Sequence, residues 1–246
     1  MPQLADRTTS RATAAPTTEP AVPSGPSAAG ALPPITEQAE RLIALGVVPE
    51  DRCSPQTLRA AAARLAEAAP EGSLLVLHPR VAPPSRLAPF LRLPGPDGER
   101  EGFVVVDMTD VDQFGPVEGV DVPDADVYAL TVLDRGDDMA NWSPEEAQPA
   151  IAARGRTPLT LSEGIHWVLQ SPAVLERNLC FMTIASRLRK PRGTYDARTP
   201  AVWISNGTGR DGRERRGAPK VGWCWWRNRH TWLGFASAER RVAAQR

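Results

Sequence analysis

The sequence is poor in the features that mark secreted, membrane or disulfide-bonded proteins. Only three cysteines occur among 246 residues, Cys53, Cys180 and Cys224, and no two of them form a CxxC pair. A secreted disulfide framework uses a dense and even set of cysteines, so we expect reduced thiols and a cytoplasmic location. No apolar run approaches the roughly 18 residues of a transmembrane helix, and no apolar signal-peptide core is present. The sequence therefore predicts no membrane partner.

Several well-known catalytic motifs are also missing. The P-loop, GxSxG and HExxH patterns do not occur, so NTP-binding, α/β-hydrolase and zinc-peptidase functions lose their main support. The formal net charge is zero, with 29 basic and 29 acidic side chains. This balance excludes a protein that coats nucleic acid through an overall positive excess. With 41% hydrophobic and 24% charged residues, the composition is that of an ordinary globular protein.

Residues 1–34 consist almost entirely of Pro, Ala, Thr, Ser and Gly. Such a segment buries too little apolar surface to offset its ordering entropy, which predicts a disordered arm. Residues 35–240 are expected to form a single α+β domain, with a sub-boundary near 97–127 as an alternative. Residues 241–246 are expected to form a tail.

Apolar spacing and capping residues predict the helices. A helix over residues 35–45, ended by Gly46, should pair with a second helix that begins at Ser54 and Pro55 to form a helical hairpin. Two S/T-x-x-E capping boxes, which start at Ser143 and Thr160, predict two central helices.

Short β-branched and aromatic runs predict the strands. In the first half of the chain they cover residues 74–77, 103–108 and 127–133, and in the last third they cover 180–186, 201–206, 221–226 and 232–236. Together with the helices, they predict an α+β fold with an N-terminal helical hairpin, central helices and a C-terminal antiparallel sheet rich in tryptophan.

The zero net charge is a cancellation between two regions. Residues 97–163 contain 16 acidic and 4 basic side chains, whereas residues 177–246 contain 16 basic and 4 acidic ones. Either these regions neutralise each other in the fold, or the basic region binds an anion such as phosphate, carboxylate or nucleic acid. Much of the positive charge lies in 187–192 and 210–216, beside five of the seven tryptophans. Arginine interleaved with aromatic rings resembles a stacking platform for bases, although tryptophan in strands is also typical of a core.

Residues 220–234 form the most unusual segment of the chain. If residues 227–229 make a three-residue hairpin loop, strand alternation places four side chains on one face, Cys224, Trp226, His230 and Trp232. Cys224 and His230 would then be diagonal neighbours about 7–8 Å apart. An imidazole and arginines beside a thiol can make it nucleophilic. The alternative interpretation is a small core cysteine packed among tryptophans.

The candidate catalytic residues are therefore Cys224 and His230, joined by two carboxylates from the turn at residues 134–138, Asp134 and Asp137. The candidate ligand-binding residues are Trp203, Trp226, Trp232, Arg227 and Arg229. The turn also suits a cation site, or simply an exposed polar loop. Convergence of Cys180, Cys224, His166 and His230 on a metal lacks the usual ligand spacing. No metal is predicted, and the sequence identifies no cofactor.

Seven short blocks follow one another in the last half of the chain: DRGD, NWSP, GRTPLT, WIS, GAPK, GWCW and HTWLG. With these blocks the sequence resembles an uncharacterised family found mainly in actinobacteria and known only as a domain of unknown function, over about residues 35–240. The resemblance implies that the DRGD turn, the GRTPLT cap and the Trp-rich hairpin belong to one constellation. It implies no activity.

Three functions remain in competition. The first is an enzyme or ligand-binding protein whose small-molecule partner, with an anion as one option, occupies a pocket walled by the C-terminal hairpin. The second is a regulatory or interaction module whose basic region binds nucleic acid or an acidic partner. The third is a structural protein without a pocket. A concave pocket with Cys224 or His230 at its floor would favour the first function over the third.

Overall fold

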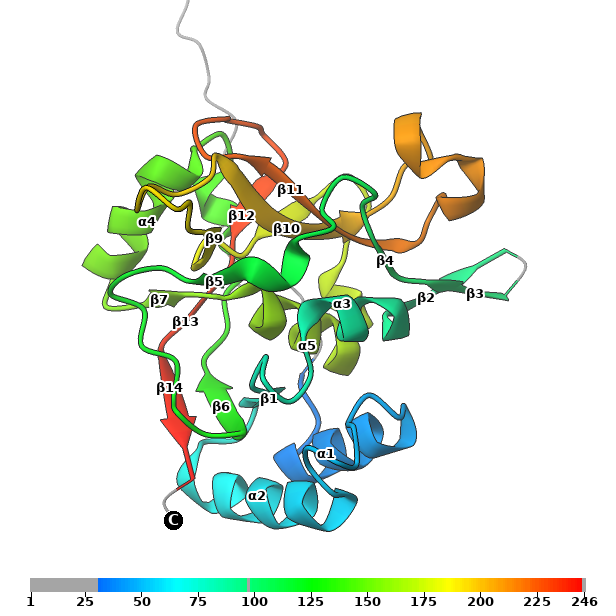
Figure 1. Ribbon diagram of the computed structural model, residues 1–246, viewed down its shortest axis with the longest axis vertical. Coiled ribbons are helices and arrows are strands. Elements are labelled where there is room, and N and C mark those ends of the chain that lie inside the picture. The colour runs from blue at the N-terminus through cyan, green and yellow to red at the C-terminus, as the bar shows by residue number, and fades with distance from the viewer. Residues whose placement is uncertain (1–30, 97, 245–246) are drawn as a thin grey trace, which may run out of the picture.

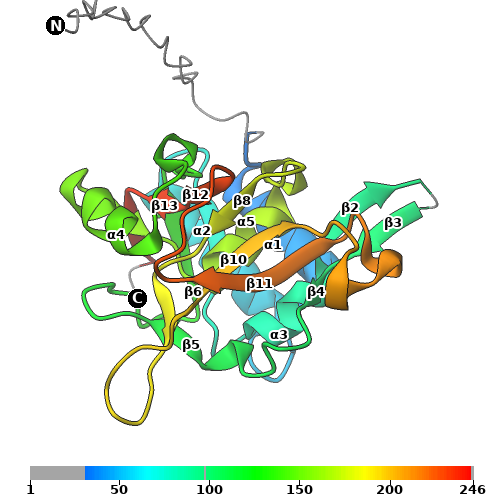
Figure 2. The same cartoon turned by 90° about the horizontal axis from the view of Figure 1, so that it is seen from above.

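A computed structural model describes residues 31–96 and 98–244 (Figures 1 and 2). The fold is α+β, as the sequence predicts. The segment expected to form a disordered arm lies outside the described residues, apart from 31–34, which have no regular structure. Within the described residues, no helix is long and apolar enough to cross a membrane.

A small antiparallel sheet has the strand order β1-β6-β14, formed by β1 (Leu74–Leu77), β6 (Val127–Thr131) and β14 (Arg240–Ala243). Helices α1 (Ile35–Ala44) and α2 (Pro55–Ala68) pack against each other and against this sheet (Figure 1). The Ser54 hydroxyl accepts a hydrogen bond from the backbone N–H of Thr57 at 3.1 Å. The predicted helical hairpin and its cap are confirmed.

Of the residues expected to form a tail, 241–243 instead belong to β14, and 245–246 lie outside the described residues. Arg241 makes an ion pair with Glu163 at 2.6 Å, and the exposed fractions of these side chains are 5% and 0%. The Tyr128 hydroxyl donates to the same carboxylate at 2.9 Å. A buried carboxylate needs such partners, so this contact attaches the end of the chain to the core. It is a long-range contact that local composition could not predict.

Helix α5 (Leu161–Gln170) lies between the small sheet and a larger one, and all ten of its residues are buried. It begins at the predicted capping box of Thr160 and Glu163. His166 is fully buried and neutral: its Nδ1 donates to the Ser162 carbonyl at 2.7 Å, and its Nε2 accepts from the Leu77 N–H at 3.1 Å. Burial lowers the pKa of His166 to about 4. Both ring nitrogens are used, so His166 is a structural residue and not a metal ligand.

The larger sheet has five strands in the order β12-β8-β10-β11-β4. Its three central strands, β8 (Cys180–Met182), β10 (Arg198–Ile204) and β11 (Pro219–Trp225), are antiparallel. The edge strands β4 (Phe103–Val104) and β12 (Leu233–Phe235) are parallel to their neighbours. The predicted C-terminal strands are present, but the sheet is mixed at its edges and not antiparallel throughout.

The predicted Trp-rich hairpin is wrong. Strand β11 pairs with β10 over seven residues on one side and with β4 at Lys220 and Val221 on the other, and β12 is not among its neighbours. Residues 226–232 instead cross to the opposite edge of the sheet, where β12 pairs with β8. The backbone of β12 finds its partners on β8 instead, and strand alternation by itself does not say which strand a segment joins.

The other predicted capping box, at Ser143 and Glu146, starts α4 (Pro144–Ala153), and the Ser143 N–H donates to the Glu146 carboxylate at 2.9 Å. The remaining elements are short: α3 (Pro84–Leu87), β2 (Arg92–Gly95), β3 (Gly98–Glu101), β5 (Phe114–Pro116), β7 (Thr157–Pro158), β9 (Ser186–Leu188) and β13 (Ser237–Ala238). The β2–β3 hairpin projects from the molecule, as does the loop between β9 and β10 (Figure 2).

The acidic and basic regions meet in the fold. Within the described part of the chain, five ion pairs join residues 97–163 to residues 177–246: Asp107 with Arg210, Asp110 with Arg198, Glu145 with Arg227, Glu146 with Arg229, and Glu163 with Arg241. The two regions therefore neutralise each other in part. The other arginines of the basic region still leave it positively charged.

Candidate functional site

The two faces of the five-stranded sheet differ in what covers them. Because side chains alternate along a strand, Phe181, Val202 and Val221 point to one face and belong to the core around α5. On the opposite face, Met182 and Phe235 belong to a second, smaller core that also contains Ala147 and Ile151 of α4. A pocket lies beside this smaller core on the same face of the sheet.

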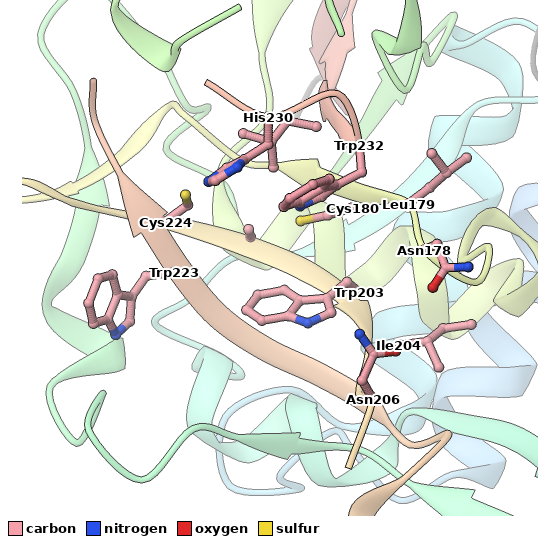
Figure 3. A pocket seen from close by; sticks show the side chains of 12 residues that line it. Asn178, Leu179, Cys180, Trp203, Ile204, Asn206, Trp223, Cys224, His230 and Trp232 are labelled. Carbon is pink, nitrogen blue, oxygen red and sulfur yellow. The ribbon is translucent and has the colours of Figure 1, made fainter. Parts of the chain in front are cut away.

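The pocket has a volume of about 500 Å³ and is lined by side chains from β8, β10, β11 and the segment before β12 (Figure 3). Its lining residues are Asn178, Leu179, Cys180, Ala201, Trp203, Ile204, Asn206, Trp223, Cys224, His230, Trp232 and Leu233. The volume is in the range of sites that bind small molecules, and a mainly apolar wall with a few polar groups is typical of such sites.

Trp203 lies against the backbone of β11 because Gly222 has no side chain. A Cβ atom on Gly222 would stand 2.6 Å from the tip of the Trp203 ring. The Lys220 ammonium lies 4.7 Å from the centre of the same ring, a cation–π contact. Lys220 Nζ is in turn bonded to Asp211 at 2.7 Å, and the Ser205 hydroxyl donates to Asp211 at 2.8 Å. A buried polar network thus holds the indole in one orientation.

His230 and Trp232 form another wall. Their rings are stacked, with centroids 4.5 Å apart and planes at 16°. The backbone of this segment is held at two points: the Asn141 N–H donates to the His230 carbonyl, and the Cys180 N–H donates to the Trp232 carbonyl, each at 2.9 Å. Trp232 nevertheless remains 49% exposed, so one of its faces is available to a ligand.

Cys224 is half-buried, and Figure 3 shows a ring nitrogen of His230 directed toward its thiol. The Asn228 side-chain amide donates to Cys224 Sγ at 3.9 Å. Burial raises the pKa of the Cys224 thiol, although this amide and a backbone N–H oppose the shift. Cys180, on the pocket floor, is fully buried, and burial raises its pKa strongly. Both residues are therefore thiols at neutral pH, which is the weakly nucleophilic form.

The structure brings four of the predicted site residues together in this pocket, although not through a hairpin: Trp203, Cys224, His230 and Trp232. The other three ligand-binding candidates do not line the pocket. Trp226 stacks on Arg187 with its ring centre 4.0 Å from the guanidinium carbon. Arg227 pairs with Glu145 at 3.2 Å, and Arg229 pairs with Glu146. These pairs attach the 226–232 segment to the start of α4.

The two candidate carboxylates do not line the pocket either. Asp134 accepts a hydrogen bond from the Gly136 N–H at 2.8 Å, and Asp137 pairs with the buried Arg135 at 2.7 Å. This turn packs on the backbone of Gly234, where a Cβ would lie 2.6 Å from the Arg135 carbonyl. The DRGD and HTWLG blocks therefore meet, as the resemblance implies, but in a structural contact outside the pocket. Within the described residues, no group of three His, Cys, Asp or Glu side chains is placed to hold a metal.

Sequence reasoning missed Asn178 and Asn206, which supply the side-chain amides of the pocket. Asn178 has a left-handed backbone in the structure, with φ at 64°, but no pattern in the sequence marks Asn178 or Asn206 as part of a site. It also missed a GxGxxG spacing at residues 207–212, which could suggest a dinucleotide site. In the structure these glycines connect the antiparallel strands β10 and β11 through 3₁₀ turns, without the strand-to-helix turn that a dinucleotide site needs.

A family of unknown function, DUF5701, matches residues 41–244. The chain belongs to this family. No curated protein and no solved structure matches the chain. Function must therefore be argued from the pocket itself.

Proposed function

We propose that this DUF5701 member binds a small molecule with a planar, conjugated ring in the pocket of Figure 3. The observation that carries the proposal is the fixed indole of Trp203, which lines the pocket while Gly222 and Lys220 hold it in place. An aromatic surface that is already ordered binds a flat ligand without the entropy cost of immobilising a side chain. The exposed Trp232 on another wall supplies a second aromatic contact.

The polar groups of the pocket would recognise the edge of the ring. Asn178 and Asn206 offer amide donors and acceptors, and His230 offers a further nitrogen. Such groups fix the orientation of a heteroaromatic ligand that carries carbonyl, amino or ring-nitrogen groups. Lys220 is paired with Asp211, so its charge does not favour an anionic ligand in this pocket.

The raised pKa of Cys224 supports a binding function over catalysis by a thiolate. The five ion pairs between the acidic and basic regions reduce the positive charge that nucleic-acid binding would use. The nucleic-acid alternative has its own test. We expect no retardation of single-stranded DNA or RNA in a low-salt gel-shift assay, and a salt-sensitive shift would favour the basic region as the functional surface.

The proposal is tested by saturation-transfer NMR with adenine, indole and benzoate as planar probes and cyclohexanol as a non-planar control. We expect at least one planar probe to bind, and its affinity to fall about tenfold, equivalent to about 1.4 kcal/mol, in Trp203→Leu and in Trp232→Leu. Trp142→Leu is the matched control, because this exposed tryptophan does not line the pocket. Absence of binding by all planar probes, or equal losses in all three variants, would refute the proposal.

A further inference from the structure

A second cavity of about 500 Å³ lies between the 113–121 segment and the hairpin that follows β9. Strands β5 and β9 pair at its base, where Gly115 is opposite Arg187. The hairpin returns through the bridge of Arg189 with Tyr195. The cavity is separate from the pocket of Figure 3 and shares none of its lining residues. It contains part of the basic 187–192 segment, which the proposed function does not use.

Arg187 is the unusual residue of this cavity. It is only 6% exposed, and its guanidinium lies between two aromatic rings, 4.0 Å from the centre of Trp226 and 5.4 Å from the centre of Tyr195. One terminal nitrogen donates to the Asp196 carbonyl at 2.5 Å. The two rings and this hydrogen bond keep the group in place, with its charge away from bulk water.

The charge of Arg187 is not neutralised by a close carboxylate. Among the described residues, no carboxylate lies within ion-pair distance of its guanidinium. The neighbouring Asp196 carboxylate instead pairs with Lys190 at 3.5 Å and with Arg198 at 3.2 Å. The Nε atom of Arg187 is buried without a hydrogen-bond partner in the described structure. Desolvation lowers the pKa of Arg187, and the nearby Asp196 and Tyr195 oppose this shift without outweighing it. A buried cation is normally paired, so this arrangement suits an anion supplied by a ligand.

The other wall of the cavity carries the opposite charge. Glu118 and Asp121 both line it and are exposed, and neither has an ion-pair partner among the described side chains. The Glu118 backbone N–H donates to the Tyr195 hydroxyl at 3.1 Å, which joins this wall to the hairpin. Two unpaired carboxylates would repel a phosphate dianion, but they would attract an ammonium group. The cavity is therefore complementary to a molecule that carries both charges.

We propose that this cavity binds a small aminocarboxylate, with its carboxylate at Arg187 and its ammonium group at Glu118 and Asp121. Arg189, which also lines the cavity, adds positive charge on the carboxylate side. The cation–π contacts hold the guanidinium in place, and the ligand carboxylate supplies the counter-charge that no described side chain provides at ion-pair distance.

The test uses the full-length protein and follows the Arg187 Nε–H resonance by NMR during titration with glycine, β-alanine and 4-aminobutyrate. Butyrate, butylamine and inorganic phosphate are the control probes, each of which carries charge of only one sign. We expect saturable shifts with at least one aminocarboxylate, and affinity about tenfold weaker in Arg187→Gln and in Glu118→Gln. Arg192→Gln, at the tip of the same hairpin and outside the cavity lining, should leave the affinity unchanged.

Three results would overturn the proposal: no shift with any aminocarboxylate, butyrate or phosphate binding as tightly as the aminocarboxylates, or no effect of Glu118→Gln. If Arg187→Gln fails to fold, the exposed Glu118→Gln variant decides the question by itself. Trp203→Leu should leave this binding intact, so failure of the planar-ring pocket and failure of this cavity can be distinguished.

Discussion

The two faces of the five-stranded sheet show how one set of strands makes both a core and a pocket. On one face lies α5, whose ten residues are all buried between two sheets. On the other lies α4, which buries only Pro144, Ala147 and Ile151. A helix that is buried on every side can seal a sheet when its polar side chains have partners, as Glu163 and His166 do, whereas a helix with a narrow apolar stripe covers only part of it. The pocket lies on the α4 side of the sheet, next to the smaller core.

The largest difference between the faces should appear in stability. Phe181 is 1% exposed and packs on Trp167 of α5, with ring centroids 5.7 Å apart. We expect Phe181→Ala to lower the free energy of unfolding by about 3–5 kcal/mol, because it leaves a cavity in a sealed core. Trp232→Ala, on the open face, should cost less than about 1 kcal/mol. Urea unfolding of both variants measures the difference, and similar losses would mean that the two faces are equally packed.

The next difference should appear in the pH dependence of stability. His166 of α5 has a pKa of about 4 in the folded protein, against 6.5 as its ordinary value. Between pH 6.5 and pH 4, His166 therefore binds a proton in the unfolded chain but not in the folded protein. The contribution of His166 to the free energy of unfolding is fully present above pH 6.5 and is lost as the pH falls toward 4, by about 3 kcal/mol in total.

Urea unfolding at pH 7.0, 6.0 and 5.0 measures this slope. We expect the slope to be much flatter in His166→Gln, and to be unchanged in His230→Gln, the control on the pocket face. An equally steep slope in His166→Gln would show that another group is responsible for the acid sensitivity.

A smaller loss of stability is expected at the close contact between Gly222 and the Trp203 ring in the pocket. Gly222→Ala places a methyl group against the Trp203 ring, so the indole must move or the strand must shift, at a cost of about 1–3 kcal/mol. The affinity for a planar probe should fall together with stability. Near-ultraviolet circular dichroism reports the orientation of the indole, and an unchanged spectrum with unchanged affinity would contradict the role assigned to Gly222.

The smallest effect should come from Cys224. The thiol is half-buried with a raised pKa, so Cys224→Ser should alter stability by less than about 1 kcal/mol. At pH 7 iodoacetamide should modify Cys224 more slowly than it modifies glutathione, and the rate should rise with pH. Mass spectrometry of the labelled peptide measures the rate. A thiol faster than glutathione at neutral pH would reopen the catalytic hypothesis for the open face.

Local chemistry predicted the helices well. Ser54, Ser143 and Thr160 all cap helices as expected, because a cap is made by residues three or four positions apart. The C-terminal strands were also found, but their partners were not. A period of two identifies a strand without saying which edge it joins, so β11 and β12 appeared to be a hairpin although two strands separate them.

The candidate site was predictable in part for the same reason. Trp203, Cys224, His230 and Trp232 are chemically conspicuous, and each lies in or next to a predicted strand. Asn178 and Asn206 could not be placed beside them in advance, because ordinary polar residues in loops have no distinguishing pattern. Arg227, Arg229 and Asp137 looked like site residues, but each is engaged by a partner distant in sequence or by the buried Arg135.

The sequence by itself determined the α+β class, the helix boundaries and the separation of acidic from basic residues, because these depend on composition and on neighbours along the chain. Only the tertiary structure decided where the charges meet, which face of the sheet carries the pocket and which buried arginine has no carboxylate at ion-pair distance among the described residues. Those properties depend on side chains that are dozens of residues apart in the chain. Behind the zero net charge, five ion pairs join the acidic and basic regions, and the buried Arg187 has no carboxylate at ion-pair distance among the described residues.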